Sequence, residues 1–151
     1  MSQTIYDVLR ASHEVQRSLL RSLLRVRNGG RRRELWAQLH VELAAHEAAE
    51  ERALYVPMLM DDRGLDASRH ALHEHHQIDE LIADLKGLVI DGDAWASKLR
   101  ELSEKVHHHL REEEKKFFQV SGKILTDTRK TGEARRYLRD HARMVRKLQQ
   151  A

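Results

Sequence analysis

Two ten-residue segments of the sequence carry the same arrangement of histidine, glutamate and aromatic residues. Residues 46–55 read HEAAEERALY, and residues 109–118 read HLREEEKKFF. Each segment has His first, Glu four and five positions later, an apolar residue eight positions later and an aromatic residue nine positions later. His and Glu four residues apart lie on one face of a helix, with Cβ atoms about 5–6 Å apart. Both side chains of each segment can therefore reach one metal ion.

The apolar stripes of the two helices predicted here include these His and Glu residues. The stripes advance by the same steps: Leu39, Leu43, His46, Glu50 and Leu54 in one, and Leu102, Val106, His109, Glu113 and Phe117 in the other. Side chains on such a stripe face the interior of a bundle. A charged carboxylate left there without a partner would cost several kcal/mol, and neither stripe contains Lys or Arg. The pattern therefore favours a buried metal centre.

Two further histidines complete the set of predicted ligands. His13 follows Leu9 by four residues on one apolar stripe, and His75 precedes Ile78 by three on another. We choose His75 over the histidines beside it because only His75 has apolar residues on its own face. The six expected ligands are His13, His46, Glu50, His75, His109 and Glu113.

This donor set determines the kind of centre that we expect. Four His and two Glu are too many ligands for one tetrahedral zinc ion. They suit two ions about 3.5–4 Å apart, with both Glu bridging and two His on each ion. Imidazole and carboxylate donors favour iron or manganese over copper, and a bridging oxygen from water would give each ion a fifth ligand. Each ion then keeps an open position for O2, hydrogen peroxide or NO.

The elements that must position these residues are helices. Apolar residues recur at helical spacing over residues 4–27, 31–60, 66–90, 94–120 and 132–149. Turn residues separate these segments at 28–30, 61–64, 91–93 and 121–122. Pro57 is expected to bend or end the second helix, and Asp93 to cap the fourth. The predicted fold class is all-α, an up-down-up-down four-helix bundle with an additional C-terminal amphipathic helix.

Composition excludes several classes of protein. The absence of cysteine excludes disulfides, thiolate zinc sites and Fe–S clusters. One proline and few aromatic residues argue against a β-sandwich. We find no basic region followed by an apolar run at the N-terminus and no apolar stretch near about 18 residues. We therefore expect a cytoplasmic protein with no membrane partner.

Charge is distributed unevenly along the chain. Residues 121–151 carry nine Lys and Arg against three Asp and Glu, whereas residues 1–120 carry 18 against 21. The positive charge belongs to the tail, so it does not indicate a nucleic-acid-binding domain. We expect residues 1–120 to form the metal-binding bundle and residues 121–151 to form a basic helix packed on it or appended to it. A basic amphipathic helix can also touch acidic partners, but packing is favoured. The expected inward residues are Ala134, Leu138, Ala142, Val145 and Leu148.

The order of His and His-x-x-x-Glu over four helices resembles the hemerythrin-like, or HHE cation-binding, family. The matching segments are His13 in YDVLRASHEVQ, His46 and Glu50 in AAHEAAEERALYVPML, His75 in LHEHHQIDELIADL, and His109 and Glu113 in VHHHLREEEKKFF. The resemblance covers residues 4–120. It implies a four-helix bundle with a non-haem diiron centre, so the expected cofactor is two Fe ions with a bridging oxo or hydroxo group. The resemblance also implies that this centre binds or senses O2, handles iron, or reacts with peroxide and NO.

One departure from the family pattern bears on function. The oxygen carriers of the family have two His four residues apart on the third helix. Here Asp79 is four residues after His75, and Gln77 is four residues after His73. The departure disfavours reversible O2 carriage and fits members with six protein ligands. We expect peroxide decomposition, with a non-catalytic sensor or store of O2 or iron as the alternative, and a metal-free interaction bundle as the third possibility.

Other metal-binding and catalytic motifs fit the sequence less well. A ferritin-like site needs Glu-x-x-His on two helices, and Glu104-x-x-His107 is the single copy. Gly-rich phosphate loops, Ser/His/Asp elbows and HExxH zinc motifs are absent. Tyr6 and Tyr55 could donate to a bridging oxygen or ligate through a phenolate, but core packing is favoured for both.

The remaining His and acidic residues are expected mainly on the surface. Glu47 is expected to be solvated, although its place beside a predicted ligand would let the centre recruit it, and a role for Asp79 is left open. The residues expected to be exposed are His40, His70, His73, His76, His107, His108, His141, Glu51, Glu112 and Glu114.

Overall fold

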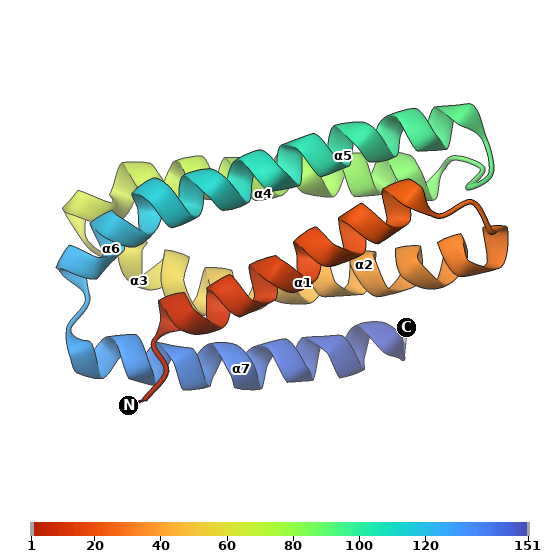
Figure 1. The fold of residues 1–151 in the computed structure, drawn as a ribbon. Coiled ribbons are helices and arrows are strands. Elements are labelled where there is room, and N and C mark those ends of the chain that lie inside the picture. The colour runs from red at the N-terminus through yellow and green to blue at the C-terminus, as the bar shows by residue number, and fades with distance from the viewer. Residues whose placement is uncertain (1, 151) are drawn as a thin grey trace.

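The computed structural model describes residues 2–150, and the described chain is helical with no strand (Figure 1). The four long helices are α1 (Ile5–Arg25), α2 (Gly29–Glu50), α4 (Leu65–Lys86) and α5 (Asp93–Glu112). The predicted all-α class with an additional C-terminal helix is confirmed, and that helix is α7 (Asp127–Gln149).

Two of the long helices continue through a π-helical turn into a shorter helix. α2 passes through η1 (Glu51–Tyr55) into α3 (Val56–Leu59), and α5 passes through η3 (Glu113–Phe117) into α6 (Phe118–Ile124). A short 3-10 turn, η2 (Asp62–Gly64), leads into α4. Both π-helical turns begin at or directly after a predicted glutamate ligand, so they occupy equivalent places in the two halves of the chain.

Side-chain caps fix the starts of three helices. The Thr4 hydroxyl accepts from the Asp7 backbone N–H, and the Asp7 carboxylate accepts from the Thr4 N–H. The side chains of Asn28 and Thr126 each accept from one backbone N–H at the start of α2 and α7, which satisfies a donor left free at a helix start. The cap predicted at Asp93 is wrong by one position, because Gly92 is the cap and Asp93 is the first helical residue.

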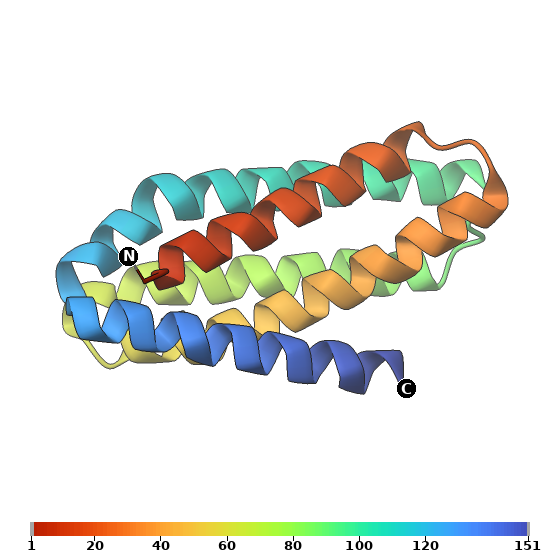
Figure 2. The same ribbon diagram turned by 60° about the horizontal axis from the view of Figure 1, so that its bottom comes forward.

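The long helices form two antiparallel hairpins that pack into a bundle. α1 pairs with α2, and α4 pairs with α5. The two views in Figures 1 and 2 show α7 lying along α2 on the outside of the four helices. α7 contacts α2 most extensively and also contacts α1. The C-terminal helix is therefore packed on the bundle.

Two apolar cores fill the bundle, one toward each end. One contains Ile5, Leu9, Leu54, Met58, Phe117 and Tyr137, and the other contains Leu20, Leu39, Ile82, Trp95, Leu99 and Leu102. Buried polar residues lie between these cores in sequence on each long helix, as His13 does between Leu9 and Leu20. The polar layer is therefore closed off from water by apolar side chains at both ends.

The helix break predicted at residues 121–122 is wrong. The helix continues to Ile124, and Leu125 leaves it with an extended backbone. Ser121 is fully buried, and its hydroxyl lies 2.7 Å from Tyr6 Oη. A buried hydrogen bond to the N-terminal helix thus stabilises helical backbone at a residue that usually favours turns.

The inward face of α7 differs from the face expected from sequence. Ala134 is buried as predicted, but the next inward residue is Tyr137, whereas Leu138 is 48% exposed. Ala142 is also exposed, and Val145 and Leu148 are half-buried. Rotation of the helix toward Tyr137 buries a larger ring and gives its hydroxyl a partner inside the bundle.

No helix in the described part of the chain has both the length and the apolar character needed to cross a membrane.

The orientation of α7 predicts that substitutions at two neighbouring residues change the free energy of unfolding by different amounts. Tyr137→Ala should lower the free energy of unfolding by about 3–5 kcal/mol, because it leaves a cavity in the core. Leu138→Ala, the matched control, should change it by less than about 0.5 kcal/mol, because that side chain is largely in water. Urea unfolding followed by circular dichroism measures both. A larger loss of unfolding free energy for Leu138→Ala than for Tyr137→Ala would support the inward face that the sequence predicted.

Candidate metal centre

All six predicted ligands lie in the polar layer between the two apolar cores. His13 comes from α1, His46 and Glu50 from α2, and His75 from α4. His109 comes from the last turn of α5, and Glu113 is the first residue of η3. Each of the six is at most 3% exposed. Residues up to 100 positions apart in sequence are thus gathered at one place.

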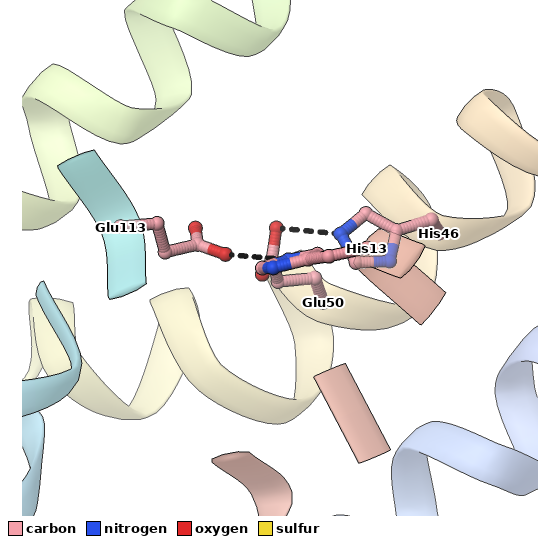
Figure 3. A group of neighbouring side chains, drawn as sticks. All are labelled: His13, His46, Glu50 and Glu113. Atoms are coloured by element: carbon pink, nitrogen blue, oxygen red, sulfur yellow. Dashed lines mark ion pairs between the residues drawn. The ribbon is translucent and has the colours of Figure 1, made fainter. Parts of the chain in front are cut away.

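Each glutamate lies between two histidines that come from different hairpins. Glu50 Oε1 is 3.3 Å from His46 Nε2 and 3.2 Å from His75 Nε2. Glu113 Oε1 is 3.1 Å from His13 Nε2, and Glu113 Oε2 is 3.7 Å from His109 Nε2. Figure 3 shows Glu113 and Glu50 directed toward His13 and His46. This is the arrangement that two bridging carboxylates require.

The ligand atoms also divide into two overlapping groups of metal-binding size. Atoms of His13, His46, Glu50 and Glu113 lie within 4.8 Å of one another. Atoms of Glu50, His75 and His109 form a second such group. Glu50 belongs to both groups, so it joins them.

The outer ring nitrogens of three of these histidines donate to carboxylates. His13 Nδ1 donates to Glu114 (2.7 Å), and His75 Nδ1 donates to Glu51 (2.9 Å). His109 Nδ1 donates to Glu74 (2.9 Å). A neutral histidine that donates from Nδ1 presents the lone pair of Nε2, and here Nε2 faces the centre.

His46 reaches a carboxylate through one hydroxyl. His46 Nδ1 lies 2.9 Å from Ser12 Oγ, and Ser12 Oγ donates to Glu42 Oε1 at 2.9 Å. Because the Ser12 proton is directed to Glu42, Ser12 Oγ accepts from His46. Tyr137 Oη is a second neighbour of His46 Nδ1, also at 2.9 Å. Burial lowers the pKa of His46, and its neutral ring, donating from Nδ1, leaves Nε2 free of a proton.

Glu51 and Glu114 are half-buried partners of the histidines, so the exposure predicted for them is wrong. Each directly follows a predicted glutamate ligand, and each holds a histidine of the opposite hairpin. The signal was present in the sequence, because the ten-residue repeat has Glu at both the fourth and fifth positions after its His. The first Glu faces the centre, and the second holds the outer side of a histidine.

Two further partners were missed in the sequence. Glu74 is 3% exposed and lies on the buried stripe between Ala71 and Ile78, where its charge could have been noticed. Tyr137 is 1% exposed and lies three residues after Ala134 on the true inward face of α7. Each lies one residue from the predicted apolar stripe, Glu74 beside His75 and Tyr137 beside Leu138.

The pKa values show how strongly the buried charges act on one another. Burial raises the pKa of Glu113 to about 6, and the neighbouring Glu50 carboxylate adds to the rise. Burial also opposes ionisation of Glu50, but contact with His46 and His75 holds its pKa well below the usual value. Burial disfavours charge on His13, yet Glu113 and Glu114 raise its pKa to about 9. The buried carboxylates of Glu50 and Glu113 repel each other, so both can be ionised only with positive charge between them.

Several atoms at the centre are buried without any hydrogen-bond partner among the described residues. They are Nε2 of His13, His46 and His109, Oε2 of Glu50 and Oε1 of Glu113. Such orphaned polar atoms are costly in a protein interior. All are nitrogen or carboxylate oxygen, the donors that suit iron, manganese or zinc. The residues therefore fit a metal centre.

Tyr55 lies inside the site, where core packing alone was favoured from sequence. Its hydroxyl is 2.8 Å from Glu50 Oε1 and 3.2 Å from His75 Nε2, and it donates to Glu113 Oε2. In an α-helix, a residue five positions after Glu50 would point about 140° away from it. The π-helical turn η1 widens the helix there and brings Tyr55 back over the carboxylates.

The other residues left open lie outside the centre. Tyr6 bonds to Ser121 rather than to a predicted ligand. Glu47 is 7% exposed, so the solvated position favoured for it is wrong, and it lies beside Glu51 on the outer side of His75. Burial holds the pKa of Glu47 well above its usual value. Asp79 is exposed.

The exposure predicted for the remaining histidines mostly agrees with the structure. Four of them are exposed, namely His70, His73, His76 and His108. His40 and His107 are half-buried, and His141 pairs with Glu42 at 3.0 Å. The histidines at the centre are thus separated clearly from the others.

Comparisons with known proteins point to one family. The family model "Hemerythrin HHE cation binding domain" matches residues 4–120. A crystal structure of a hemerythrin HHE cation binding domain-containing protein from Mycobacterium kansasii superposes with a TM-score of 0.85 at 20% identity. The superposition covers 95% of this chain and 88% of that one.

A curated relative matches over part of its length. A protein from Nostoc sp. named "DNA nickase" is 26% identical over 114 residues. The match covers 76% of this chain and 32% of the relative, so the chain spans about a third of that protein. With buried His and Glu groups at its centre and a family match over most of its length, the chain belongs to the hemerythrin HHE cation binding domain family.

Proposed function

We propose that the protein is a non-haem diiron protein that decomposes hydrogen peroxide and also binds O2 and NO. The proposed ligands are the six residues predicted from sequence: His13, His46, Glu50, His75, His109 and Glu113. The observation that carries the proposal is that each glutamate lies between two histidines of different hairpins. Such an arrangement supports two ions bridged by two carboxylates better than it supports one ion.

The chain's own residues would prepare the centre before any small molecule arrives. The carboxylates behind the histidines hold each ring in the orientation that presents Nε2 and raise its basicity. The two apolar cores exclude water from both ends of the polar layer. Two bound iron ions would supply a two-electron redox couple, through which one peroxide molecule is reduced to water and another is oxidised to O2.

Tyr55 is the proposed proton donor at this centre. Its hydroxyl is fully buried and lies among Glu50, Glu113 and His75. Burial and the two carboxylates hold the pKa of Tyr55 well above its usual value, so the phenol keeps its proton. With Glu50 and Glu113 serving as metal ligands, the Tyr55 hydroxyl would be free to donate its proton to a small molecule at the centre.

A sensor is the second candidate, and one contact favours it. Tyr137 of α7 lies 2.9 Å from the outer nitrogen of His46. A change in charge at the centre would reach α7 through this contact. In that case the protein would release no product, and α7 would signal the state of the centre.

The proposed partners are small molecules. The name of the Nostoc relative raises DNA as a partner, but the match covers 32% of that protein. Residues 1–120, which contain the centre, carry more acidic than basic side chains. We also propose residues 1–120 as the metal-binding unit, with residues 121–151 covering one side of it.

Metal content and gas evolution test the proposal most directly. The purified protein should be coloured, absorb in the near ultraviolet and contain about two irons per chain. It should release O2 from hydrogen peroxide, as measured with an oxygen electrode. His109→Ala should lose both iron and gas evolution, whereas His73→Ala, an exposed control, should keep both. A colourless protein that binds zinc alone would rule out the diiron centre.

Removal of the metal should lower thermal stability. A ligand present at about 100 times its Kd stabilises a fold by about 2.7 kcal/mol. For a chain of this size that corresponds to roughly 5–10 °C in Tm. Treatment with a chelator should therefore lower Tm by this amount, and added Fe2+ should restore it, as scanning calorimetry would measure. An unchanged Tm would mean that the buried polar atoms are satisfied without metal.

The role of Tyr55 has its own test. Tyr55→Phe should keep iron but slow peroxide decomposition on the order of 100-fold, because a positioned proton donor contributes at least this much. Tyr6→Phe is the matched control, since its hydroxyl bonds Ser121 away from the centre. Iron content and O2 release are measured on both variants. Equal rates in the two would assign Tyr55 to packing alone.

A further inference from the structure

Two more His-x-x-x-Glu pairs face each other on the outer surface of the bundle. His70 and Glu74 are one turn apart on α4, and His108 and Glu112 are one turn apart on α5. They repeat the spacing of the buried pairs, but the second pair is displaced by one residue from His109 and Glu113. The displacement turns it outward, so that it meets α4 at the surface rather than in the core.

Each imidazole of the four side chains lies within 3.7 Å of both carboxylates. Glu112 Oε2 lies 3.3 Å from His70 Nε2 and 3.4 Å from His108 Nε2. Glu74 Oε1 is 3.6 Å from His70 Nε2, and Glu74 Oε2 is 3.7 Å from His108 Nε2. Ligands on a tetrahedral ion with bonds of about 2.0–2.2 Å are about 3.4 Å apart. The four imidazole-to-carboxylate distances are close to that value, and atoms of His70, Glu74 and Glu112 lie within 4.8 Å of one another.

One side of this cluster is fixed and the other is open to solvent. The Glu74 side chain is 4% exposed and is held by the hydrogen bond from His109 Nδ1. The His70 and His108 side chains are 60% and 52% exposed. An ion can therefore approach from water and meet a carboxylate that is already oriented.

Two lysines are the cations now near these carboxylates. Lys105 Nζ lies 3.5 Å from Glu74 Oε2, and Lys116 Nζ lies 3.2 Å from Glu112 Oε1. Both are single contacts made by flexible side chains, and Lys116 is 78% exposed. A divalent ion held by two imidazoles and two carboxylates would replace both contacts, and the exposed Lys116–Glu112 pair contributes little.

A cleft connects the cluster to the buried centre. The cleft has a volume of about 340 Å³, and His70, Glu74 and Glu112 line it together with His109 and Glu113. The same space thus touches three residues of the outer cluster and two proposed ligands of the inner one. Glu74 belongs to the outer cluster and also orients His109, so the two places share a side chain.

We propose that His70, Glu74, His108 and Glu112 form a second, solvent-facing site for a divalent transition-metal ion. The donors are two imidazoles and two carboxylates, a set that suits Fe2+ and Zn2+. The site lies at the mouth of the cleft and is the place where ions enter on their way to the buried centre. Binding at the outer site stands on its own residues, whereas the entry role rests on the proposed function.

Zinc titration tests the outer site. The wild-type protein should bind one Zn2+ per chain more than H70N/H108N, as measured by isothermal titration calorimetry with zinc chloride. The matched control is H73N/H76N, which removes two exposed histidines of α4, one of them in the exposed pair His76 and Glu80. That control should bind as many ions as the wild type. Circular dichroism should show all three proteins equally folded.

Two results would overturn the outer site. One is an equal number of zinc ions in the wild type and H70N/H108N. The other is an equal loss in H70N/H108N and H73N/H76N, which would indicate general binding by surface histidines.

Iron uptake tests the entry role separately. Fe2+ is added in air to chelator-treated protein, and near-ultraviolet absorbance is followed by stopped flow. H70N/H108N should reach the same final iron content as the wild type, but at least fivefold more slowly. Equal rates would overturn the entry role. If no protein takes up iron, the diiron proposal and the entry role both fail, while the zinc count still decides whether the outer site exists.

Discussion

The structure depends on two carboxylates that are held close together away from water. Glu50 is fully buried and Glu113 is 3% exposed, and neither has a Lys or Arg partner among the described residues. The four histidines around this pair are oriented by further polar side chains. The histidines face the carboxylates, and a further shell of Glu51, Glu74 and Glu114 fixes the histidines. The cost of burying such a layer explains why it is enclosed by two large apolar cores, because the folding energy must come from them.

The two hairpins repeat one another, but they do not do so in full. Each has the same His-x-x-x-Glu pair followed by a π-helical turn, and each lends its second glutamate to a histidine of the other hairpin. The two halves differ in the aromatic residue that lies nine positions after the histidine. It is Tyr55 beside His75 in one half and Phe118 beside His13 in the other. The centre is therefore symmetric in its donors and asymmetric in its nearest hydroxyl, which distinguishes one side of the site for a small molecule.

Much of this could be predicted from the sequence, because burial follows helical periodicity. The stripes placed His46, Glu50, His109 and Glu113 inward, and the structure finds all of them buried. Features that depend on local departure from the α-helix were not accessible, and Tyr55 is the clearest case because η1 alone brings it over the carboxylates. The sequence placed a helix end at residues 121–122, whereas α6 continues to Ile124. The hydrogen bond between Tyr6 and Ser121 overrides the local preference for a turn there. The inward face of α7 was misread because its pattern of apolar residues allows two rotations, and only the hydroxyl partner of Tyr137 distinguishes them.

The position of α7 has a consequence for how the protein is made. α7 leaves the ribosome after α1 to α6, yet it packs on the first two helices, and its Tyr137 meets a residue 91 positions earlier. Closure over such a separation is entropically slow compared with the pairing of neighbouring helices. While the chain is being synthesised, the α1–α2 hairpin therefore has one side facing water, with the outer nitrogen of His46 accessible there. When α7 packs on this hairpin, it shields that side of the new bundle from water.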